Sequence, residues 1–183
     1  MKKIPSVWKR DFSKKGAPYL DEVAPGCEWV LAGEGVVTRK WDGAACRIDD
    51  DGMLWARYDA KHGKQPPQDF EPCGQPDSET GHWPGWVPAI RPQDQWIREA
   101  VKPLSPKRPG TYEAVGPKIN GNPERLEQHV AIRHSESAQY ADAPRTFDGL
   151  RAWLEPLDIE GVVFHHPDGR MAKATKQGFG LKR

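Results

Sequence analysis

The run Asp49-Asp50-Asp51-Gly52 constrains the possible folds most, because it interrupts a long stretch of extended character. We interpret residues 28–33 and 34–60 as extended structure. An Asp-Gly pair between two such runs is among the strongest short-range signals for a hairpin turn. We therefore predict an antiparallel hairpin, with Arg47 on its first arm and Arg57 on its second.

The rest of the chain carries signals for helices and for further strands. Helices are predicted from Pro92 to about Lys102, from Asn122 through Gln128, and from Phe147 to Leu154 after a cap at Thr146. Strands are predicted over 110–115 and 130–133, and a final hairpin over 159–165 and 171–176. This mixture predicts an α+β protein in which antiparallel sheets are flanked by helices.

Residues 61–92 differ from their surroundings, because they are rich in proline and glycine and show no sustained period. We predict a long loop here. Its two tryptophans, Trp83 and Trp86, pack either against the loop's own core, which we favour, or against a substrate cleft.

Composition fits one globular domain. At 183 residues, of which 37% are hydrophobic, the chain can bury a single core. We therefore expect residues 1–183 to form one domain. The cysteines match no metal or redox spacing, no apolar run is long enough to span a membrane, and no signal-peptide pattern follows the start. We expect a soluble, cytoplasmic protein.

The charge is balanced overall but concentrated at the termini. With 27 basic and 26 acidic residues, the net charge of +1 gives no field that would by itself hold nucleic acid. Basic residues crowd both ends: Lys2, Lys3, Lys9, Arg10, Lys14, Lys15, Arg170, Lys173, Lys176, Lys182 and Arg183. These residues either form solvated surfaces or contact phosphates.

A series of short motifs carries the chemistry. In chain order they are Lys40-Trp41-Asp42-Gly43, Thr111-Tyr112-Glu113, Glu160-Gly161-Val162-Val163, and the lysines Lys173 and Lys176. We expect the lysine of the first motif at the end of a strand. A lysine amine attacks phosphorus only in its neutral form, and an ordinary lysine is almost wholly protonated at neutral pH. Positive charge close to that amine would disfavour its ammonium form.

The candidate sources of that charge are Lys173, Lys176, Arg57 and a divalent metal ion. A metal requires carboxylates, and the motifs supply three candidate ligands: Asp42, Glu113 and Glu160.

In its order and residue types, this series resembles the covalent nucleotidyltransferases, the superfamily of ATP-dependent DNA ligases, RNA ligases and mRNA capping enzymes. The resemblance implies an ATP-grasp-like nucleotidyltransferase domain with a nucleotide cleft. It implies ATP as the cofactor together with Mg²⁺, or Mn²⁺ as an alternative. Lys40 would capture AMP as a phosphoramidate.

The resemblance also implies roles for the other motif residues. Asp42 would hold a metal-bound water, and Gly43 would let the backbone approach the nucleotide. Arg57 would engage the sugar or the substrate end, with Arg47 a weaker candidate. Glu113 would bind the ribose hydroxyl, Glu160 would bind metal, and Lys173 and Lys176 would contact the α-phosphate.

Within the superfamily, the sequence is most similar to the small RNA ligases of the phage RNA ligase 1 type. The similarity rests on Gly-Thr-Tyr-Glu-Ala-Val-Gly at 110–116, Glu-Gly-Val-Val-Phe at 160–164 and Phe-Gly-Leu-Lys at 179–182. It implies an enzyme that adenylylates a 5′-phosphate RNA end and seals it to a 3′-hydroxyl. A DNA ligase, a capping-type guanylyltransferase and a non-catalytic module that binds nucleic-acid ends are the alternatives.

Two departures from the superfamily pattern qualify the roles. Its last motif usually spaces two lysines one residue apart, whereas Lys173 and Lys176 are three positions apart. A regular strand would direct them to opposite faces, so either a bulge occurs or only one lysine reaches the phosphate, and Lys173 is the first choice. The second departure is that an appended oligonucleotide-binding (OB-fold) domain is not expected, so a protein partner could supply a substrate-binding domain.

Overall fold

The computed structural model describes residues 3–77 and 81–183. Its sheets are antiparallel and its helices are few and short, which confirms the α+β class. The chain divides into two compact units. Unit 1 is built around Asp42–Glu136, and unit 2 combines Ile4–Trp41 with Ser137–Arg183. That residues 1–183 act as a single nucleotidyltransferase domain stays a prediction.

Unit 2 contains a three-stranded sheet of order β11-β10-β3 and a separate pair, β1-β2. Its elements are β1 (Trp8–Arg10), β2 (Tyr19–Val23), α1 (Glu28–Leu31), β3 (Val36–Lys40), α3 (Phe147–Leu154), β10 (Gly161–His165) and β11 (Met171–Thr175). The predicted hairpin over 159–176 is confirmed as the pair β10–β11. Thr146 caps α3 as predicted, because its side-chain oxygen accepts a hydrogen bond from the Gly149 N–H.

One face of this sheet forms the core of unit 2. Val37 of β3, Phe164 of β10 and Ala172 of β11 occupy one register row and are buried together with Leu150 and Leu154 of α3. Because side chains alternate along a strand, the residues between them belong to the other face. That second face carries Thr38, Lys40 and Lys173.

The prediction of extended structure over 28–33 is wrong, because Glu28–Leu31 form the helical turn α1. Trp29 and Val30, which are adjacent in this turn, are both buried in the core of unit 2. Gly33 ends the turn at a positive φ of 84°. The Gly33 N–H donates to the Val30 carbonyl and the Glu34 N–H to the Trp29 carbonyl, a pairing typical of a glycine-terminated helix.

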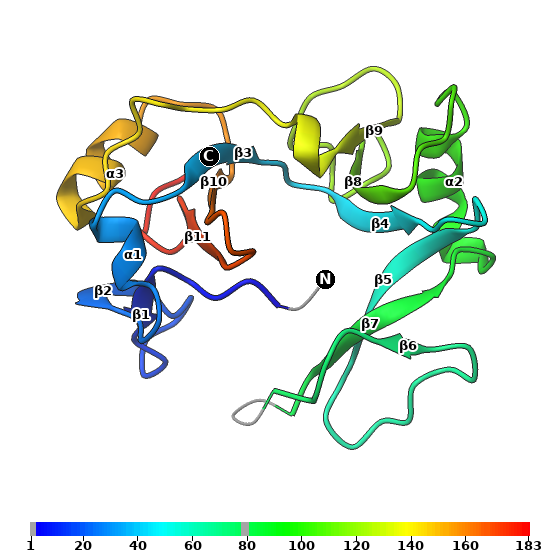
Figure 1. The fold of residues 1–183 in the computed structure, drawn as a ribbon, viewed down its shortest axis with the longest axis horizontal. Helices are drawn as coiled ribbons and strands as arrows, with labels where there is room; N and C mark the ends of the chain where they lie inside the picture. Colours follow the sequence, from blue (N-terminus) through cyan, green and yellow to red (C-terminus); the bar gives the residue numbers. More distant parts are fainter. Residues whose placement is uncertain (1–2, 78–80) are drawn as a thin grey trace. The chain divides into compact units, whose positions relative to one another are not determined.

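Unit 1 contains a six-stranded sheet of order β6-β7-β5-β4-β8-β9. Its elements are β4 (Ala44–Ile48), β5 (Leu54–Ala60), β6 (Glu71–Pro72), β7 (Trp83–Pro88), the 3-10 turn η1 (Pro92–Asp94), α2 (Gln95–Val101), β8 (Gly110–Val115), β9 (Val130–Arg133) and the 3-10 turn η2 (His134–Glu136). Figure 1 shows β5 and β7 side by side and α2 next to β8 and β9. The predicted hairpin is confirmed as β4–β5, with Arg47 on β4 and Arg57 on β5.

The core of unit 1 lies between one face of its sheet and α2. Cys46, Ala56 and Ala114 occupy this face and pack in one cluster with Ile97 and Val101 of α2. The helix and the strands predicted over 92–102, 110–115 and 130–133 are therefore confirmed, with the first turn of the helix in 3-10 form.

The loop predicted over 61–92 is wrong in part, because it contains β6 and β7. β7 pairs with β5 over six residues, so pairing across the sheet overrides the turn-forming composition. Trp86 is 2% exposed and Trp83 packs against Phe70, which agrees with packing against the protein's own core. Ser78, Glu79 and Thr80 of the predicted loop lie outside the described residues.

The helix predicted from Asn122 through Gln128 is also wrong, since this segment forms turns. Asn122 has a φ of 58°, whereas a residue that caps a helix N-terminus has extended backbone geometry. Its side-chain amide instead accepts from the Leu126 N–H and donates to the Leu126 carbonyl. Those hydrogen bonds close a loop where a helix would have begun. Over the described part of the chain, the helices are all too short or too polar to cross a membrane.

Candidate functional site

The lysine of the first motif lies at the end of β3, as predicted. Lys40 pairs in register with Gly161, the first residue of β10, so Glu160, which directly precedes β10, lies close to it. The Lys40 Nζ donates a hydrogen bond of 2.5 Å to the Glu160 Oε2, and the two side chains are 23% and 25% exposed. The amine is therefore held as the cationic partner of a carboxylate, and it must leave this ion pair before it can act as a nucleophile.

The two later lysines have different environments. Lys173 pairs in register with Val163, which in turn pairs with Thr38, so Lys173 belongs to the same face of the sheet as Lys40. Lys176 follows the end of β11, is 5% exposed, and donates to the Glu155 carbonyl at 3.1 Å. Only Lys173 thus shares a strand face with the first lysine. This answers the spacing problem without a bulge.

Unit 1 carries predicted site residues on the sheet face opposite α2. Glu113 pairs with Ala45, and the β4–β5 register continues this row to Arg57. The Arg57 guanidinium lies 5.4 Å from the centroid of the Trp86 ring and donates to the Cys73 Sγ at 3.5 Å. On this face of the sheet, the charged side chain of Arg57 therefore packs against an aromatic ring.

Arg47 lies on the same face as Arg57 but is occupied by structural contacts. It donates to the Glu71 Oε2 at 2.6 Å and lies over the ring of Trp55, 4.8 Å from its centroid. The Trp55 Nε1 in turn donates to Asp49 in the hairpin turn. These contacts tie Arg47 into the packing of the sheet.

Glu113 takes part in a short hydrogen-bonded chain. His134 contacts the Glu113 Oε2 through Nε2 at 2.9 Å and the Thr111 Oγ1 through Nδ1 at 3.0 Å. The side chain of Glu113 is only 13% exposed and that of His134 is 25% exposed. The carboxylate is therefore fixed in position by a neighbour rather than left mobile in water.

The Asp42-Gly43 pair is held by the segment between β8 and β9. The Asn120 Nδ2 donates to the Gly43 carbonyl at 2.8 Å and to the Asp42 Oδ1 at 3.3 Å, and the Asp42 N–H donates to the Glu124 Oε1. Asn120 adopts a left-handed φ of 49°, which is uncommon outside glycine. Asparagine adopts this region more readily than most other residues, so the sequence suits a turn here.

Two glycines sit where no side chain fits. A Cβ atom at Gly43 would overlap the Ala114 carbonyl oxygen, and one at Gly161 would overlap the Ala174 carbonyl oxygen. Each glycine follows a predicted metal ligand, Asp42 or Glu160. Close packing against the neighbouring strand therefore fixes the backbone directly after each acid.

Sequence reasoning missed His134, Asn120 and Glu124. Their partners are 21, 77 and 82 positions away along the chain. No short sequence motif predicts contacts between residues so far apart in the chain. The only sequence signal near them is Asn120-Gly121, which indicates a turn but not what the turn holds.

Two of the three thiols, those of Cys27 and Cys46, are buried. Burial and, to a smaller extent, the charge of Glu113 raise the pKa of Cys46 to about 12. Burial likewise raises the pKa of Cys27. Within 3–77 and 81–183, no three His, Cys, Asp or Glu side chains gather closely enough to hold a metal ion. The proposed set of Asp42, Glu113 and Glu160 stays a prediction.

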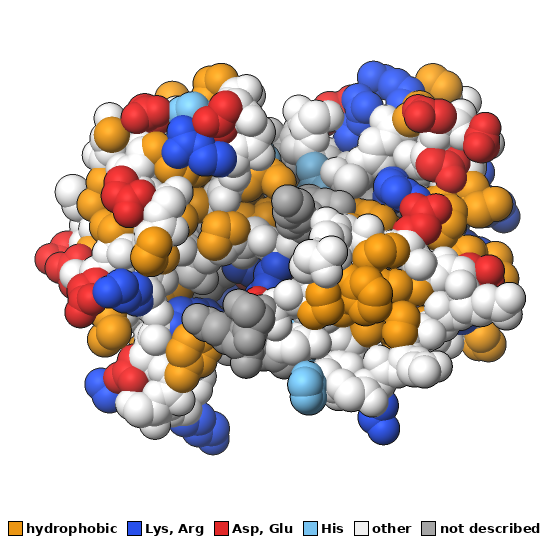
Figure 2. Space-filling model, turned by 60° about the horizontal axis from the view of Figure 1, so that its bottom comes forward, with side chains coloured by type: hydrophobic (Ala, Val, Ile, Leu, Met, Phe, Trp, Pro, Cys, Tyr) orange, Lys and Arg blue, Asp and Glu red, His pale blue; other side chains and the backbone are white. Residues whose placement is uncertain are grey.

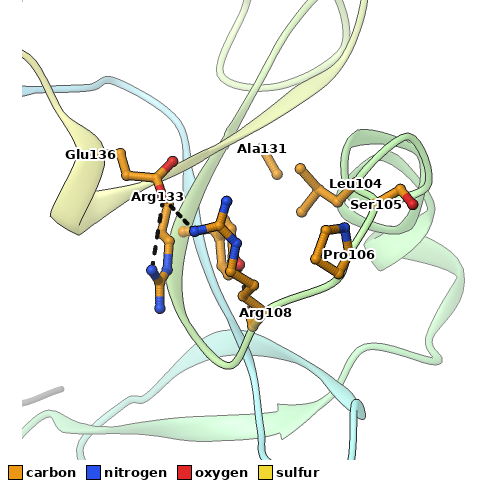
Figure 3. A pocket seen from close by; sticks show the side chains of 8 residues that line it. Leu104, Ser105, Pro106, Arg108, Ala131, Arg133 and Glu136 are labelled. Atoms are coloured by element: carbon orange, nitrogen blue, oxygen red, sulfur yellow. Dashed lines mark hydrogen bonds and ion pairs between the residues drawn. The ribbon is translucent and has the colours of Figure 1, made fainter.

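A small hollow in unit 1 lies apart from these residues. It has a volume of about 120 Å³ and is lined by Leu104, Ser105, Pro106, Arg108, Tyr112, Ala131, Arg133 and Glu136. Its two arginines both pair with Glu136, as Figure 3 shows. Ligand pockets measure roughly 300–1,000 Å³, so this one is too small for a nucleotide. Its ion pairs instead anchor the turn η2, which carries His134.

Several basic residues near the termini form ion pairs with acids. Lys3 pairs with Asp77, Lys9 with Glu22, Lys14 with Asp11 and Arg170 with Asp168, while Lys2 lies outside the described residues. On the face drawn in Figure 2, acidic and basic side chains are interspersed. These pairs favour solvated surfaces over a continuous phosphate-binding strip.

Comparison with known proteins supports the resemblance to RNA ligases. The chain is 28% identical to RNA ligase 1 of Pongo abelii over 80% of this chain and 67% of that protein. It is 26% identical to RNA ligase 1 of Mus musculus and of Rattus norvegicus over the same shares. No family model matches the sequence. The similarity covers most of the chain and points to RNA ligases as relatives.

Proposed function

We propose that the protein is an ATP-dependent RNA ligase that works through an AMP adduct on Lys40. The observation that carries the proposal is the placement of Lys40 at a strand end, paired with Glu160, on the sheet face that also bears Lys173. The similarity to proteins named RNA ligase 1 supports this choice among nucleotidyltransferases.

In the first step, the Lys40 amine leaves Glu160, loses a proton to solvent and attacks the α-phosphorus of ATP. A bond forms between Nζ and phosphorus, and the bond from phosphorus to pyrophosphate breaks. The positive charge of Lys173 would disfavour the ammonium form of Lys40 and contact the α-phosphate. The neighbouring Thr38 holds His165 at 2.9 Å, which fixes this part of the sheet.

The acidic residues of the motifs have the chemistry that a hard divalent cation prefers, although no three of the described acids, histidines or cysteines gather around one point. Glu160 already holds a cation, the Lys40 ammonium, and carboxylate oxygens are the ligands that Mg²⁺ prefers. Glu160 would hold Mg²⁺, or Mn²⁺ in its place, with Asp42 and Glu113 as the further ligands. A bound metal would neutralise charge on the phosphates of ATP.

Unit 1 would supply recognition of the nucleotide. Glu113 would accept a hydrogen bond from a ribose hydroxyl, and Arg57 would engage the sugar or the substrate end. Gly43 would allow close approach of the backbone. In the later steps AMP passes to the 5′-phosphate of an RNA end, and a 3′-hydroxyl displaces AMP to form the phosphodiester.

The test is incubation of the protein with Mg²⁺ and α-labelled ATP. We expect a labelled protein that is absent in Lys40→Ala and retained in Lys9→Ala, a matched control in which a strand lysine of the same unit loses its ion pair with Glu22. Label of full intensity in Lys40→Ala would refute the proposal. An absence of label with every nucleotide would favour a non-catalytic module that binds nucleic-acid ends.

Two further comparisons separate the remaining alternatives. Labelling by GTP in preference to ATP would indicate a capping-type guanylyltransferase. Sealing of 5′-phosphorylated DNA, but not of RNA, would indicate a DNA ligase. Strands should be offered with and without a complementary splint. A requirement for a second protein in the sealing steps alone would indicate a partner that supplies a substrate-binding domain.

A further inference from the structure

We propose that His134 is a positioning residue that orients Glu113 toward the ribose and so sets a preference for ATP over deoxynucleotides. The inference rests on the proposed function, because it takes Glu113 as the ligand of a ribose hydroxyl. Its content is separate: a histidine in the turn η2, directly after β9, sets how strongly the Glu113 carboxylate discriminates between nucleotides.

Sheet register brings the histidine to the carboxylate. β8 and β9 pair antiparallel, with Glu113 opposite Ile132, and this register continued by two residues sets His134 opposite Thr111. Residues two apart on a strand share a face, so Thr111, Glu113 and His134 lie on the same side of the sheet. The opposite side, with Tyr112 and Ala114, packs in the cluster that contains α2.

With an ionised Glu113 and a neutral His134, the two contacts of the imidazole allow one arrangement of protons. An ionised carboxylate only accepts, so the contact of 2.9 Å requires His134 to donate from Nε2 to the Glu113 Oε2. In the neutral ring Nδ1 then accepts, and the Thr111 hydroxyl donates to it at 3.0 Å. The histidine thus occupies Oε2, and Oε1 is the oxygen that can accept from a ribose hydroxyl.

The turn that carries His134 is itself anchored. Glu136, two residues further on, pairs with Arg108 at 3.4 Å and with Arg133 at 3.7 Å (Figure 3). The Arg133 Nη2 also donates to the Pro109 carbonyl. Because Glu136 is paired with two arginines, the turn η2 is anchored. The backbone of His134 is therefore fixed, and its imidazole can hold the Glu113 carboxylate in one position. A supporting group of this kind gives a binding site its selectivity.

The expected effect follows from how hydroxyl recognition works. A site built to hydrogen-bond a hydroxyl rejects an analogue that lacks it, because its partner is then left unsatisfied. Without His134, the Glu113 carboxylate can rotate toward water and satisfy itself there. A nucleotide that lacks the ribose hydroxyl would then be rejected less strongly. The preference for ATP over the deoxynucleotide would fall, while the affinity for the deoxynucleotide itself would change little.

The experiment measures binding in a Lys40→Ala background, where no adduct can form. Dissociation constants for ATP, 2′-deoxy-ATP and 3′-deoxy-ATP are determined by calorimetry in the presence of Mg²⁺. The parent should prefer ATP over at least one deoxynucleotide by about tenfold or more, the range of one hydrogen bond to a charged group. His134→Ala should reduce this ratio to about threefold or less.

Three variants make the test specific. His134→Gln, whose amide can donate to Glu113 and accept from Thr111, should restore part of the preference. His82→Ala is the matched control, because His82 pairs with Asp59 at 2.9 Å in the same unit, and it should leave the ratio unchanged. In Glu113→Ala, adding His134→Ala should have no further effect on the ratio. Thr111→Val replaces His134→Ala if that protein does not fold.

Several outcomes would overturn the inference: equal affinities of the parent for ATP and both deoxynucleotides, an unchanged ratio in folded His134→Ala, an effect of His134→Ala that persists without Glu113, or no ATP binding. Failure of the proposed function looks different. The protein with Lys40 intact would then bind ATP with the expected preference and still form no labelled adduct.

Discussion

Two carboxylates, one in each unit, are held in opposite ways. Glu160 in unit 2 is neutralised by the ammonium of Lys40, whereas Glu113 in unit 1 is hydrogen-bonded to His134. The first contact must be broken before the proposed reaction can begin. The second can persist throughout. Under the proposed function, unit 2 would store its nucleophile in an ion pair, while unit 1 would keep its recognition group preorganised.

The energetics agree with this difference. Lys40 and Glu160 are each about one-quarter exposed, so water can reach both groups when the ion pair separates. Glu113 is nearly buried, and a fixed acceptor in such surroundings needs no reorganisation when its ligand arrives. The following variants test the contrast, from the largest expected effect to the smallest.

Replacing Glu160 should have the largest effect. We expect Glu160→Ala to reduce the rate of lysyl-AMP formation by about 100-fold or more, because it removes both the partner of Lys40 and the proposed metal ligand. Rapid-quench labelling with α-labelled ATP measures this rate. Glu22→Ala, which breaks the ion pair with Lys9, is the matched control. Wild-type rates in Glu160→Ala would remove Glu160 from the site.

The two lysines near the end of the chain should separate activity from stability. Lys173→Ala should slow adduct formation by about 100-fold, in the range for loss of one electrostatic donor, with little change in melting temperature. Lys176→Met should lower the melting temperature, because it leaves the Glu155 carbonyl without its donor, and should affect the rate less. The reverse order of effects on rate would show that the wrong lysine faces the phosphate.

Removing the Asn120 side chain should have a smaller effect. We expect Asn120→Gly to slow adduct formation by about tenfold, since the Asp42-Gly43 pair loses two hydrogen bonds that position it. Glycine tolerates the left-handed backbone at this position, so the variant isolates the side chain from strain. Asn120→Ala adds that strain and should also be less stable to heat. Equal rates in Asn120→Gly and wild type would make the contact structural only.

The smallest effects concern two turn aspartates, one in each unit. The Arg170 backbone N–H holds the pKa of Asp168 down to about 2, and the Trp55 indole N–H lowers the pKa of Asp49. Because both pKa values are lower in the folded protein, the ionised carboxylates stabilise the fold at a pH above the usual pKa near 3.8. This contribution is lost as the pH falls below that value, down to about 2 for Asp168. Asp168→Asn and Asp49→Asn should each slightly reduce the decrease in the free energy of unfolding at acidic pH, measured by urea unfolding. If the free energy of unfolding fell as steeply with decreasing pH as in the wild type, the lowered pKa values assigned to these aspartates would be contradicted.

Local signals in the sequence predicted much of the fold. The Asp-Gly hairpin turn, the Thr146 cap and the strand over 110–115 each depend on residues a few positions apart, and each is confirmed. The errors arise where distant contacts decide. β7 forms because β5 pairs with it, and the loop at Asn122 forms because its side chain closes on Leu126. The exception is α1, where Gly33 was a local signal for a helix end.

The same distinction applies to the candidate site. Motif residues could be identified by type and order, and Lys40 could be placed at a strand end. The spacing of Lys173 and Lys176 showed that they cannot both lie on one face of a regular strand. Nothing in the sequence predicted that Glu160 and Lys40 pair across two strands, or that His134 supports Glu113. Such pairings depend on sheet register, which follows from the whole fold.

The two glycines that follow the acids have a practical consequence for large-scale mutagenesis. Every replacement of Gly43 or Gly161 inserts atoms where a neighbouring carbonyl oxygen already lies. A map of tolerated substitutions would therefore show these glycines to be as intolerant of replacement as Lys40 and Glu160. Neither glycine, however, has a side chain that could take part in chemistry. Assays that count surviving variants cannot distinguish the two kinds of intolerance, whereas measurements of soluble yield can.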